Sequence, residues 1–194
     1  MRAFVALFPP ADVVEHLGEF LAPRRAARGP QAGAIVPRWT RDEHLHLTLA
    51  FLPDLADRDL EELADRLAQA AAKRPLDLLR LAGGGAFPDP IDARVLWVGV
   101  QPESGHEQLA RLAGSVRSAA NSAGALVSGG AFTAHVTVAR LARATRATRW
   151  LRVLQAYDGP DWQPEHLTLV RSHLGQGPHR TPRYEELGTF ALGE

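Results

Sequence analysis

The stretch HLHLTLAF, residues 44–51, alternates polar and apolar side chains along its whole length. Alternate side chains of a β-strand point to opposite faces, so in a strand His44, His46 and Thr48 would share one face. The apolar residues between them would share the other face: Leu45, Leu47, Leu49 and Phe51. We therefore expect a strand that buries one face in a core and presents two imidazoles and a hydroxyl on the other.

The pattern His-x-Thr between aliphatic residues occurs twice more, as HVTV at 135–138 and HLTL at 166–169. The chain has eight histidines in 194 residues. Its composition would give roughly 0.4 such pairs by chance, so three copies carry more weight than a single short motif. The first two copies lie 89 residues apart, which suggests one copy in each of two similar lobes.

A histidine and a threonine two residues apart on a strand lie about 6.6–6.8 Å apart on one face, so both can contact the same ligand group. Imidazole titrates near neutral pH, so one of His46 and His135 can take a proton from water while the other gives one to a leaving oxygen. Thr48 and Thr137 can donate hydrogen bonds to non-bridging phosphate oxygens. Two such pairs that face each other favour cleavage of a phosphodiester without a metal.

Two other interpretations use the same residues. His44 and His46 have a spacing that can ligate zinc or iron, but a third ligand is needed, and Asp42 and Glu43 are neighbours in sequence rather than convergent groups. A cleft that only binds nucleotides or RNA ends is also compatible with the motifs. Two titrating groups paired with two hydroxyls argue for catalysis over binding alone.

The composition limits the classes of partner. Lys plus Arg and Asp plus Glu both number 22, so no overall positive field would attract long nucleic acid, and any contact with RNA should be local to a cleft. The chain has no cysteine, which excludes disulfides and thiolate chemistry. It shows no signal peptide and no apolar run of the length of a membrane span. We expect a cytoplasmic monomer that has no membrane contact.

Hydrophobic periodicity predicts strands and helices that alternate along one domain, residues 1–194, and the second half resembles the first in outline. The fold class is α+β, with two lobes of mostly antiparallel sheet and outer helices. A glycine-rich patch, GGGAF at 83–87, indicates a turn or bulge. The strands are expected near 2–8, 44–51, 76–82, 94–100, 132–140, 166–174 and 183–192. The helices are expected near 11–22, 58–73, 105–122 and 143–157, and a loop over 23–33.

WTRDEHLHLTLAFL at 39–52 and FTAHVTVAR at 132–140 resemble the paired signatures of the two-histidine (2H) phosphoesterases. Within that superfamily the chain is similar to the bacterial and archaeal RNA 2′,3′-cyclic phosphodiesterases, also described as 2′-5′ RNA ligases. The resemblance covers nearly the whole chain. It implies a bilobal fold around a central cleft and a metal-independent hydrolysis, with no cofactor, of the terminal 2′,3′-cyclic phosphate of RNA to a 2′-phosphate. RNA ends, oligonucleotides and cyclic nucleotides are the implied substrates, and 2′-5′ ligation or 2′-5′ bond cleavage is the nearest alternative.

The resemblance also implies roles for single residues. His46 would donate a proton to the departing 3′ oxygen, His135 would accept one from water, and Thr48 and Thr137 would bind the phosphate, although the near-symmetry of the motifs leaves the reverse assignment of the histidines open. Arg140 would lie near the phosphate. Strict alternation puts Arg140 on the face opposite His135, so a bulge or the strand end must turn it inward.

The resemblance assigns no required role to two further histidines. His44 is expected at a strand entry or cleft rim. His166 shares a face with Thr168 and Ser172 and could line the rim, but it is not part of the family's signature. Arginines recur at 143, 146, 149 and 152, which predicts a solvated helix stripe with a possible role in guiding an RNA strand.

Overall fold

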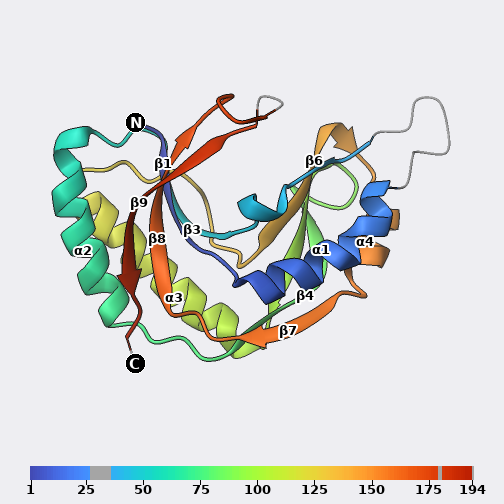
Figure 1. The fold of residues 1–194 in the computed structure, drawn as a ribbon, viewed down its shortest axis with the longest axis horizontal. Coiled ribbons are helices and arrows are strands. Elements are labelled where there is room, and N and C mark those ends of the chain that lie inside the picture. The colour runs from blue at the N-terminus through green and yellow to red at the C-terminus, as the bar shows by residue number, and fades with distance from the viewer. Residues whose placement is uncertain (27–35, 179–180, 194) are drawn as a thin grey trace.

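The computed structural model describes residues 1–26, 36–178 and 181–193. Within these ranges the chain forms helices and strands in the mixed order of an α+β protein (Figure 1). The α-helices are α1 (Ala11–Ala26), α2 (Leu60–Ala72), α3 (Glu103–Ser122) and α4 (Thr148–Leu154), and the 3₁₀ helices are η1 (Asp42–His44) and η2 (Asp57–Asp59). The strands are β1 (Ala3–Leu7), β2 (Arg38–Trp39), β3 (Leu47–Leu52), β4 (Leu79–Phe87), β5 (Ala93–Gln101), β6 (Val136–Thr145), β7 (Asp158–Trp162), β8 (His166–His173) and β9 (Arg183–Ala191).

The strands form one sheet in the order β7-β4-β5-β6-β3-β1-β8-β9, with β2 paired to β6. Every pairing is antiparallel, as the sequence predicts. The strands β3 and β6 meet through a single residue pair, Leu47 with Val136. This narrow junction divides the sheet into two halves, one ending at β3 and the other at β6, and the two predicted lobes correspond to these halves.

The halves of the sheet are not the halves of the sequence. One half combines β1 and β3 with β8 and β9, so it joins the two ends of the chain, and the other is built from β4, β5, β6 and β7. The outline repeat in the sequence is therefore misleading as a guide to the lobes, because β8 returns to pair with β1. The prediction of one His-x-Thr copy in each lobe is nevertheless correct for the first two copies.

Helices cover the sheet on both sides of the junction. Helices α2 and α3 pack on each other; α2 packs on β8 and β9, and α3 packs on β3 of one half and β5 of the other, whereas α1 packs on β7 and α4 on β4 and β5 (Figure 1). No described helix has the length and apolar character needed to cross a membrane. The cores of both halves are rich in leucine, valine and alanine.

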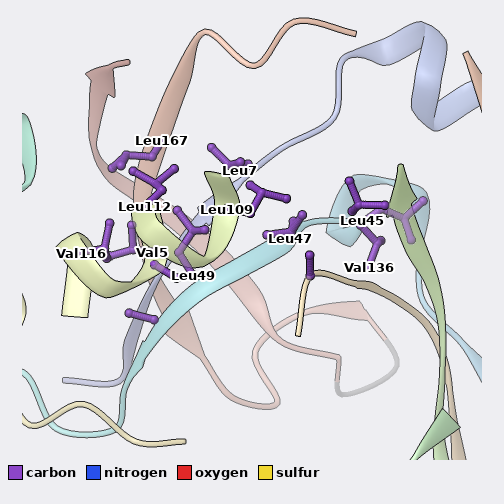
Figure 2. Close-up of a cluster of buried hydrophobic side chains, with 14 of the residues drawn as sticks. Val5, Leu7, Leu45, Leu47, Leu49, Leu109, Leu112, Val116, Val136 and Leu167 are labelled. Carbon is purple, nitrogen blue, oxygen red and sulfur yellow. The ribbon is translucent and has the colours of Figure 1, made fainter. Parts of the chain in front are cut away.

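The strand β1, with the sequence AFVAL, has no polar residue and is buried on both faces, which suits a strand between two neighbours and under helices. Helix α3 places Leu109, Leu112 and Val116 on one buried stripe, the spacing expected of an amphipathic helix. Figure 2 shows this stripe against Val5 of β1 and the leucines of β3. These buried contacts fix the position of the HLHLTLAF stretch.

Three predicted boundaries are wrong. The strand expected at 44–51 begins at Leu47, because the preceding residues turn through η1 and the amide of Leu45 donates to the carbonyl of Asp42. The strand expected at 132–140 begins at Val136. Helix α1 extends to Ala26 past Pro23, where Arg25 holds the last turn through the Thr40 carbonyl and Asp42. The remainder of the loop expected there, 27–33, lies outside the described residues.

The helix expected over 143–157 is also wrong. Strand β6 continues to Thr145, where it pairs with Ala93 of β5, and only Thr148–Leu154 is helical. The alanine and arginine of this segment favour a helix intrinsically, but pairing with β5 overrides that preference. The arginine stripe is therefore not a helix face, since Arg143 lies on β6 and Arg146 in the turn that follows.

The glycine-rich patch lies inside β4 rather than after a strand at 76–82. Gly83 has φ of +65°, and the pairing with β5 shifts register between Ala82 and Gly84, so the predicted bulge is confirmed. A Cβ on Gly85 would overlap the ring of Trp97, so residue 85 must also be small. Trp97 in turn packs beside His135, with ring centroids 6.0 Å apart.

Candidate active site

His46 is held just before β3 by two buried neighbours and one hydrogen bond. Leu45 and Leu47 are 2% and 0% exposed, so they fix the backbone on both sides of the histidine. Nδ1 of His46 lies 2.7 Å from the carbonyl oxygen of His44. A carbonyl can only accept, so Nδ1 carries the proton and donates it. The ring also stacks on Phe4, with centroids 4.7 Å apart and planes at 23°.

His135 is held in the same way just before β6. Its Nδ1 donates to the carbonyl of Thr133 at 2.7 Å, and the flanking residues Ala134 and Val136 are 1% and 0% exposed. Its ring meets Phe87 edge to face, with centroids 4.9 Å apart. In both histidines Nδ1 is occupied by the carbonyl two residues earlier, so Nε2 is the nitrogen left to accept or donate a proton.

A bulge follows each His-x-Thr motif and changes which residues face the motif. In β3 the pairing with β1 skips Leu49, because Val5 pairs with Ala50 and Ala6 with Thr48. In β6 the pairing with β5 skips Val138 in the same manner, since Leu96 pairs with Ala139 and Trp97 with Thr137. After a bulge the alternation resumes one residue out of step.

The two bulges explain one success and one error of the sequence analysis. The bulge in β6 turns Arg140 to the face of His135 and Thr137, which is the bulge that the sequence analysis requires for Arg140 to lie near them. The equivalent bulge in β3 turns Phe51 away from the leucine face, which simple alternation assigns to it, and Leu52 takes the buried position at 0% exposed. The motifs thus have the same three-residue pattern: His46, Thr48 and Phe51 in one half, and His135, Thr137 and Arg140 in the other.

These six residues line one cavity of about 610 Å³ at the junction of the sheet halves. The sequence predicts both histidines, both threonines and Arg140 as site residues, and the structure brings all five to this cavity. His44 lies at its rim with its ring 4.4 Å from that of Tyr184. The cavity walls carry four arginines, Arg2, Arg38, Arg41 and Arg140, and the further residues Phe4, Trp39, Thr40, Ser172, Leu174, Gly175, Thr181, Pro182 and Tyr184.

The third copy of the motif does not join the cavity. His166 is exposed at the far end of β8, where it pairs with Ala191 of β9, and Thr168 is buried at 5% exposed. His166, Thr168 and Ser172 share one face of β8, and of these three residues only Ser172 lines the cavity. Strand β8 runs alongside β1, so distance along the strand separates His166 from the site.

Burial dominates the electrostatics of the two imidazoles. Burial is the main cause that brings the pKa of His46 down to about 4; the positive charges of His44, His135 and Arg140 act in the same direction, and the hydrogen bond to the His44 carbonyl opposes them. Burial also lowers the pKa of His135, with Arg140 acting in the same direction. Both imidazoles are therefore neutral at pH 7 in the empty cleft, and an anion bound between them would favour their protonation.

The metal alternative lacks a third ligand. Asp42 is 2.8 Å from Arg25 and Glu43 is 2.5 Å from Arg41, so arginines engage both carboxylates near His44 and His46. Across residues 1–26, 36–178 and 181–193, no group of three or more histidine, aspartate or glutamate side chains has the arrangement of a metal site.

Several cavity residues escape the sequence analysis. Arg2, Phe4 and Tyr184 reach the site through the pairing of β1 with β3 and β8 and of β8 with β9. Arg38 reaches it through the pairing of β2 with β6. These are contacts between distant segments, and no local pattern in the sequence signals them. Phe4 lies on a wholly apolar strand, so its place in the sequence is equally compatible with a position in the core.

Comparisons with known proteins match most of the chain. A family model described as the 2′-5′ RNA ligase superfamily matches residues 10–176. A Thermus thermophilus protein named RNA 2′,3′-cyclic phosphodiesterase is 33% identical over 198 residues, covering 99% of this chain and 90% of that protein. A relative of the same name from Archaeoglobus fulgidus is 32% identical over 141 residues, or 73% of each chain. One from Geobacillus stearothermophilus is 33% identical over 156 residues, but the match spans about half of its length, 47%.

Solved structures share the fold along its whole length. A crystal structure from Thermus thermophilus covers 100% of both chains with a TM-score of 0.75 at 29% identity. E. coli LigT, crystallised without ligand, covers 100% of this chain and 98% of its own with a TM-score of 0.73 at 27% identity. The same protein crystallised with 3′-AMP gives a TM-score of 0.74. The bilobal α+β fold and a family match that includes both His-x-Thr motifs lead to one conclusion: the chain belongs to the 2′-5′ RNA ligase superfamily.

Proposed function

We propose that the protein hydrolyses the terminal 2′,3′-cyclic phosphate of RNA to a 2′-phosphate, without a metal. One observation carries the proposal: two imidazoles, each fixed at Nδ1 by a carbonyl, share one cavity with two threonines and Arg140. The names of the relatives support the reaction class. The E. coli LigT complex with 3′-AMP supports a nucleotide phosphate as the ligand of such a cleft.

In the proposed reaction Nε2 of His135 accepts a proton from water as the water oxygen attacks phosphorus. The bond from phosphorus to the 3′ oxygen breaks, and Nε2–H of His46 protonates that oxygen. The products are a 2′-phosphate and a free 3′ hydroxyl. Thr48, Thr137 and Arg140 would donate hydrogen bonds to the non-bridging oxygens, where negative charge must be stabilised.

The assignment of His46 as the donor depends on the substrate. In the empty cleft burial holds the pKa of His46 at about 4, so at pH 7 roughly one molecule in a thousand would carry the proton. A bound phosphate supplies the missing negative charge and stabilises the imidazolium. The proposal therefore includes proton uptake on binding, which calorimetry in buffers of different ionisation enthalpy would detect. Binding without proton uptake would favour the reverse assignment of the histidines or a different mechanism.

The experiment is incubation of the protein with a short RNA that ends in a 2′,3′-cyclic phosphate, in EDTA, with identification of the product. A 2′-phosphate is expected. A 3′-phosphate would reverse the regiochemistry, and loss of turnover in EDTA would overturn the metal-free mechanism. Joining of a 2′-5′ bond when a 5′-hydroxyl RNA is added would support the ligase alternative, for which the family's name is the specific support.

Substitution of the histidines tests the catalytic roles. We expect His46→Ala and His135→Ala each to reduce kcat by about 10²–10⁴-fold, the range for loss of one proton transfer. His166→Ala is the matched control, since it removes an identical motif residue that is exposed and outside the cavity. Retention of nucleotide binding with no turnover in the unchanged protein would instead support a binding module.

A further inference from the structure

Two arginines face each other across the short ladder beside the site. Arg38 of β2 is paired directly with Arg140 of β6, and residues in such a pair have Cα atoms about 4.5–5.5 Å apart with side chains on the same face. Both line the catalytic cavity. Like charges directly opposite on a sheet are destabilising, so this pair needs a compensating anion or a functional reason to persist.

No carboxylate compensates the pair in the part of the chain that the structure describes. Neighbouring arginines are matched: Arg25 pairs with Asp42 at 2.8 Å, and Arg41 pairs with Glu43 at 2.5 Å. Over residues 1–26, 36–178 and 181–193, Arg38 and Arg140 have neither an ion pair nor a side-chain hydrogen bond. The two guanidinium groups are thus available to anions in the cavity.

The two arginines reach the cavity from different strands. Arg140 follows His135 and Thr137 along the chain, the bulge in β6 turns it to their face, and its charge lowers the pKa of both His46 and His135. Arg38 comes from the separate strand β2, which pairs with β6 at Arg140 and Ala139, so it belongs to neither His-x-Thr pattern. A single phosphate between the histidines would satisfy Arg140 and leave Arg38 without a partner.

We infer that Arg38, beside Arg140, forms a second phosphate subsite that binds the phosphodiester on the 5′ side of the terminal nucleotide. The substrate class is then an RNA 3′ end of at least two nucleotides, and cyclic mononucleotides are poorer substrates because they leave this subsite empty. The inference rests on the proposed function for the identity of the terminal group. Guanidinium groups suit this task because they donate hydrogen bonds in pairs to phosphate oxygens.

A binding experiment tests the subsite without requiring turnover. The ligands are adenosine 2′-phosphate and the dinucleotide ApA that carries the same terminal 2′-phosphate, and Kd is measured by calorimetry. The unchanged protein should bind the dinucleotide more tightly. Arg38→Ala should weaken binding of the dinucleotide by about tenfold, the size of one charge-assisted hydrogen-bonded contact. The Kd of the mononucleotide should change little, so the preference for the dinucleotide falls by the same factor. Arg38→Ala should also reduce the salt slope for the dinucleotide by about 0.7, the value for one phosphate of a single strand.

Arg2→Ala is the charge-matched control. Arg2 lines the same cavity in the other sheet half, with its guanidinium 4.3 Å from the centre of the Phe51 ring. Its removal should weaken both ligands to a similar extent, because it lowers the positive potential without touching the second subsite. Arg38 is exposed on a two-residue strand, and an unchanged Tm would verify that the variant is folded.

The outcomes separate the subsite from the proposed reaction. Equal weakening of both ligands by Arg38→Ala would overturn the inference and assign Arg38 to the terminal phosphate. Absence of any preference for the dinucleotide in the unchanged protein would also overturn it. A preference that depends on Arg38, in a protein that fails to hydrolyse cyclic phosphates, would support the subsite while rejecting the proposed reaction.

Discussion

The two halves of the cleft use one backbone design in two chemical environments. In each half a histidine is held by the carbonyl two residues earlier, a threonine follows two residues later, and a bulge turns the third residue inward. In the β3 half that third residue is Phe51, and His46 stacks on Phe4. In the β6 half it is Arg140, and His135 meets Phe87 edge to face.

The difference shows how a near-symmetric frame can support unequal roles. Phe4, Phe8 and Tyr184 form an aromatic wall around His46, and burial is the main cause that lowers its pKa to about 4. The pKa of His135 is also lowered, by burial and by the charge of Arg140, which lies in the same half. Two groups of one type with different environments are the usual basis for separate acid and base roles.

Among the changes that test the difference between the halves, the one at the third position has the largest expected effect. Arg140→Phe would make the β6 half match the β3 half at the cavity, and we expect kcat/KM to fall by about 10²–10³-fold, the range for loss of one donor that stabilises developing charge. The pKa of His46 should rise in the same variant, because the charge of Arg140 lowers it. Steady-state kinetics with a cyclic-phosphate RNA and an NMR titration of the imidazoles measure the two effects.

Phe51→Leu is the matched change in the other half. It keeps an apolar side chain at the equivalent position, so its effect on kcat/KM should be less than about tenfold. Equal losses for Arg140→Phe and Phe51→Leu would contradict the unequal roles, because they would show that the third position matters only for packing.

The bulges also mark where sequence reasoning fails. The motif residues His46, Thr48, His135 and Thr137 are visible in the sequence because each pair is local and the pattern is repeated. Phe51 is misplaced because alternation cannot reveal an extra residue in β3, whose position depends on the pairing with β1. Arg38 and Tyr184 escape notice because they reach the cavity only through pairing between distant strands. The helix expected from 143 fails for the same reason, since β5 imposes strand structure there.

An effect of intermediate size is expected on the pH dependence of stability. Between pH 6.5 and 4 the unfolded chain binds a proton at His46 that the folded chain rejects, so the free energy of unfolding falls as the pH is lowered through this window. At pH 5 the loss from His46 is about 2 kcal/mol, or roughly thirtyfold in the folding equilibrium. His135 acts in the same direction, since its pKa is also lowered.

Denaturant unfolding at pH 7 and pH 5 measures this loss, and His46→Gln should remove most of it. His166→Gln, which changes an exposed side chain outside the cavity, is expected to keep the loss unchanged. If His46→Gln leaves the pH dependence as it was, then the aromatic wall does not exclude water from His46, and the proposed difference between the halves disappears.

Small effects are expected at the threonines, where the two halves are most alike. Thr48→Val and Thr137→Val each remove one hydroxyl that lines the cavity and keep the side-chain shape, so kcat/KM should fall by about tenfold for the loss of one hydrogen bond to a charged group. Thr168→Val, in the third motif copy and 5% exposed, should leave the kinetics unchanged, whatever its effect on stability. Similar losses at Thr48 and Thr137 would mean that the two halves share the phosphate charge evenly. A loss confined to Thr137 would place the developing charge on the Arg140 side and extend the asymmetry to the hydroxyls, whereas no loss at either position would exclude the threonines from phosphate binding.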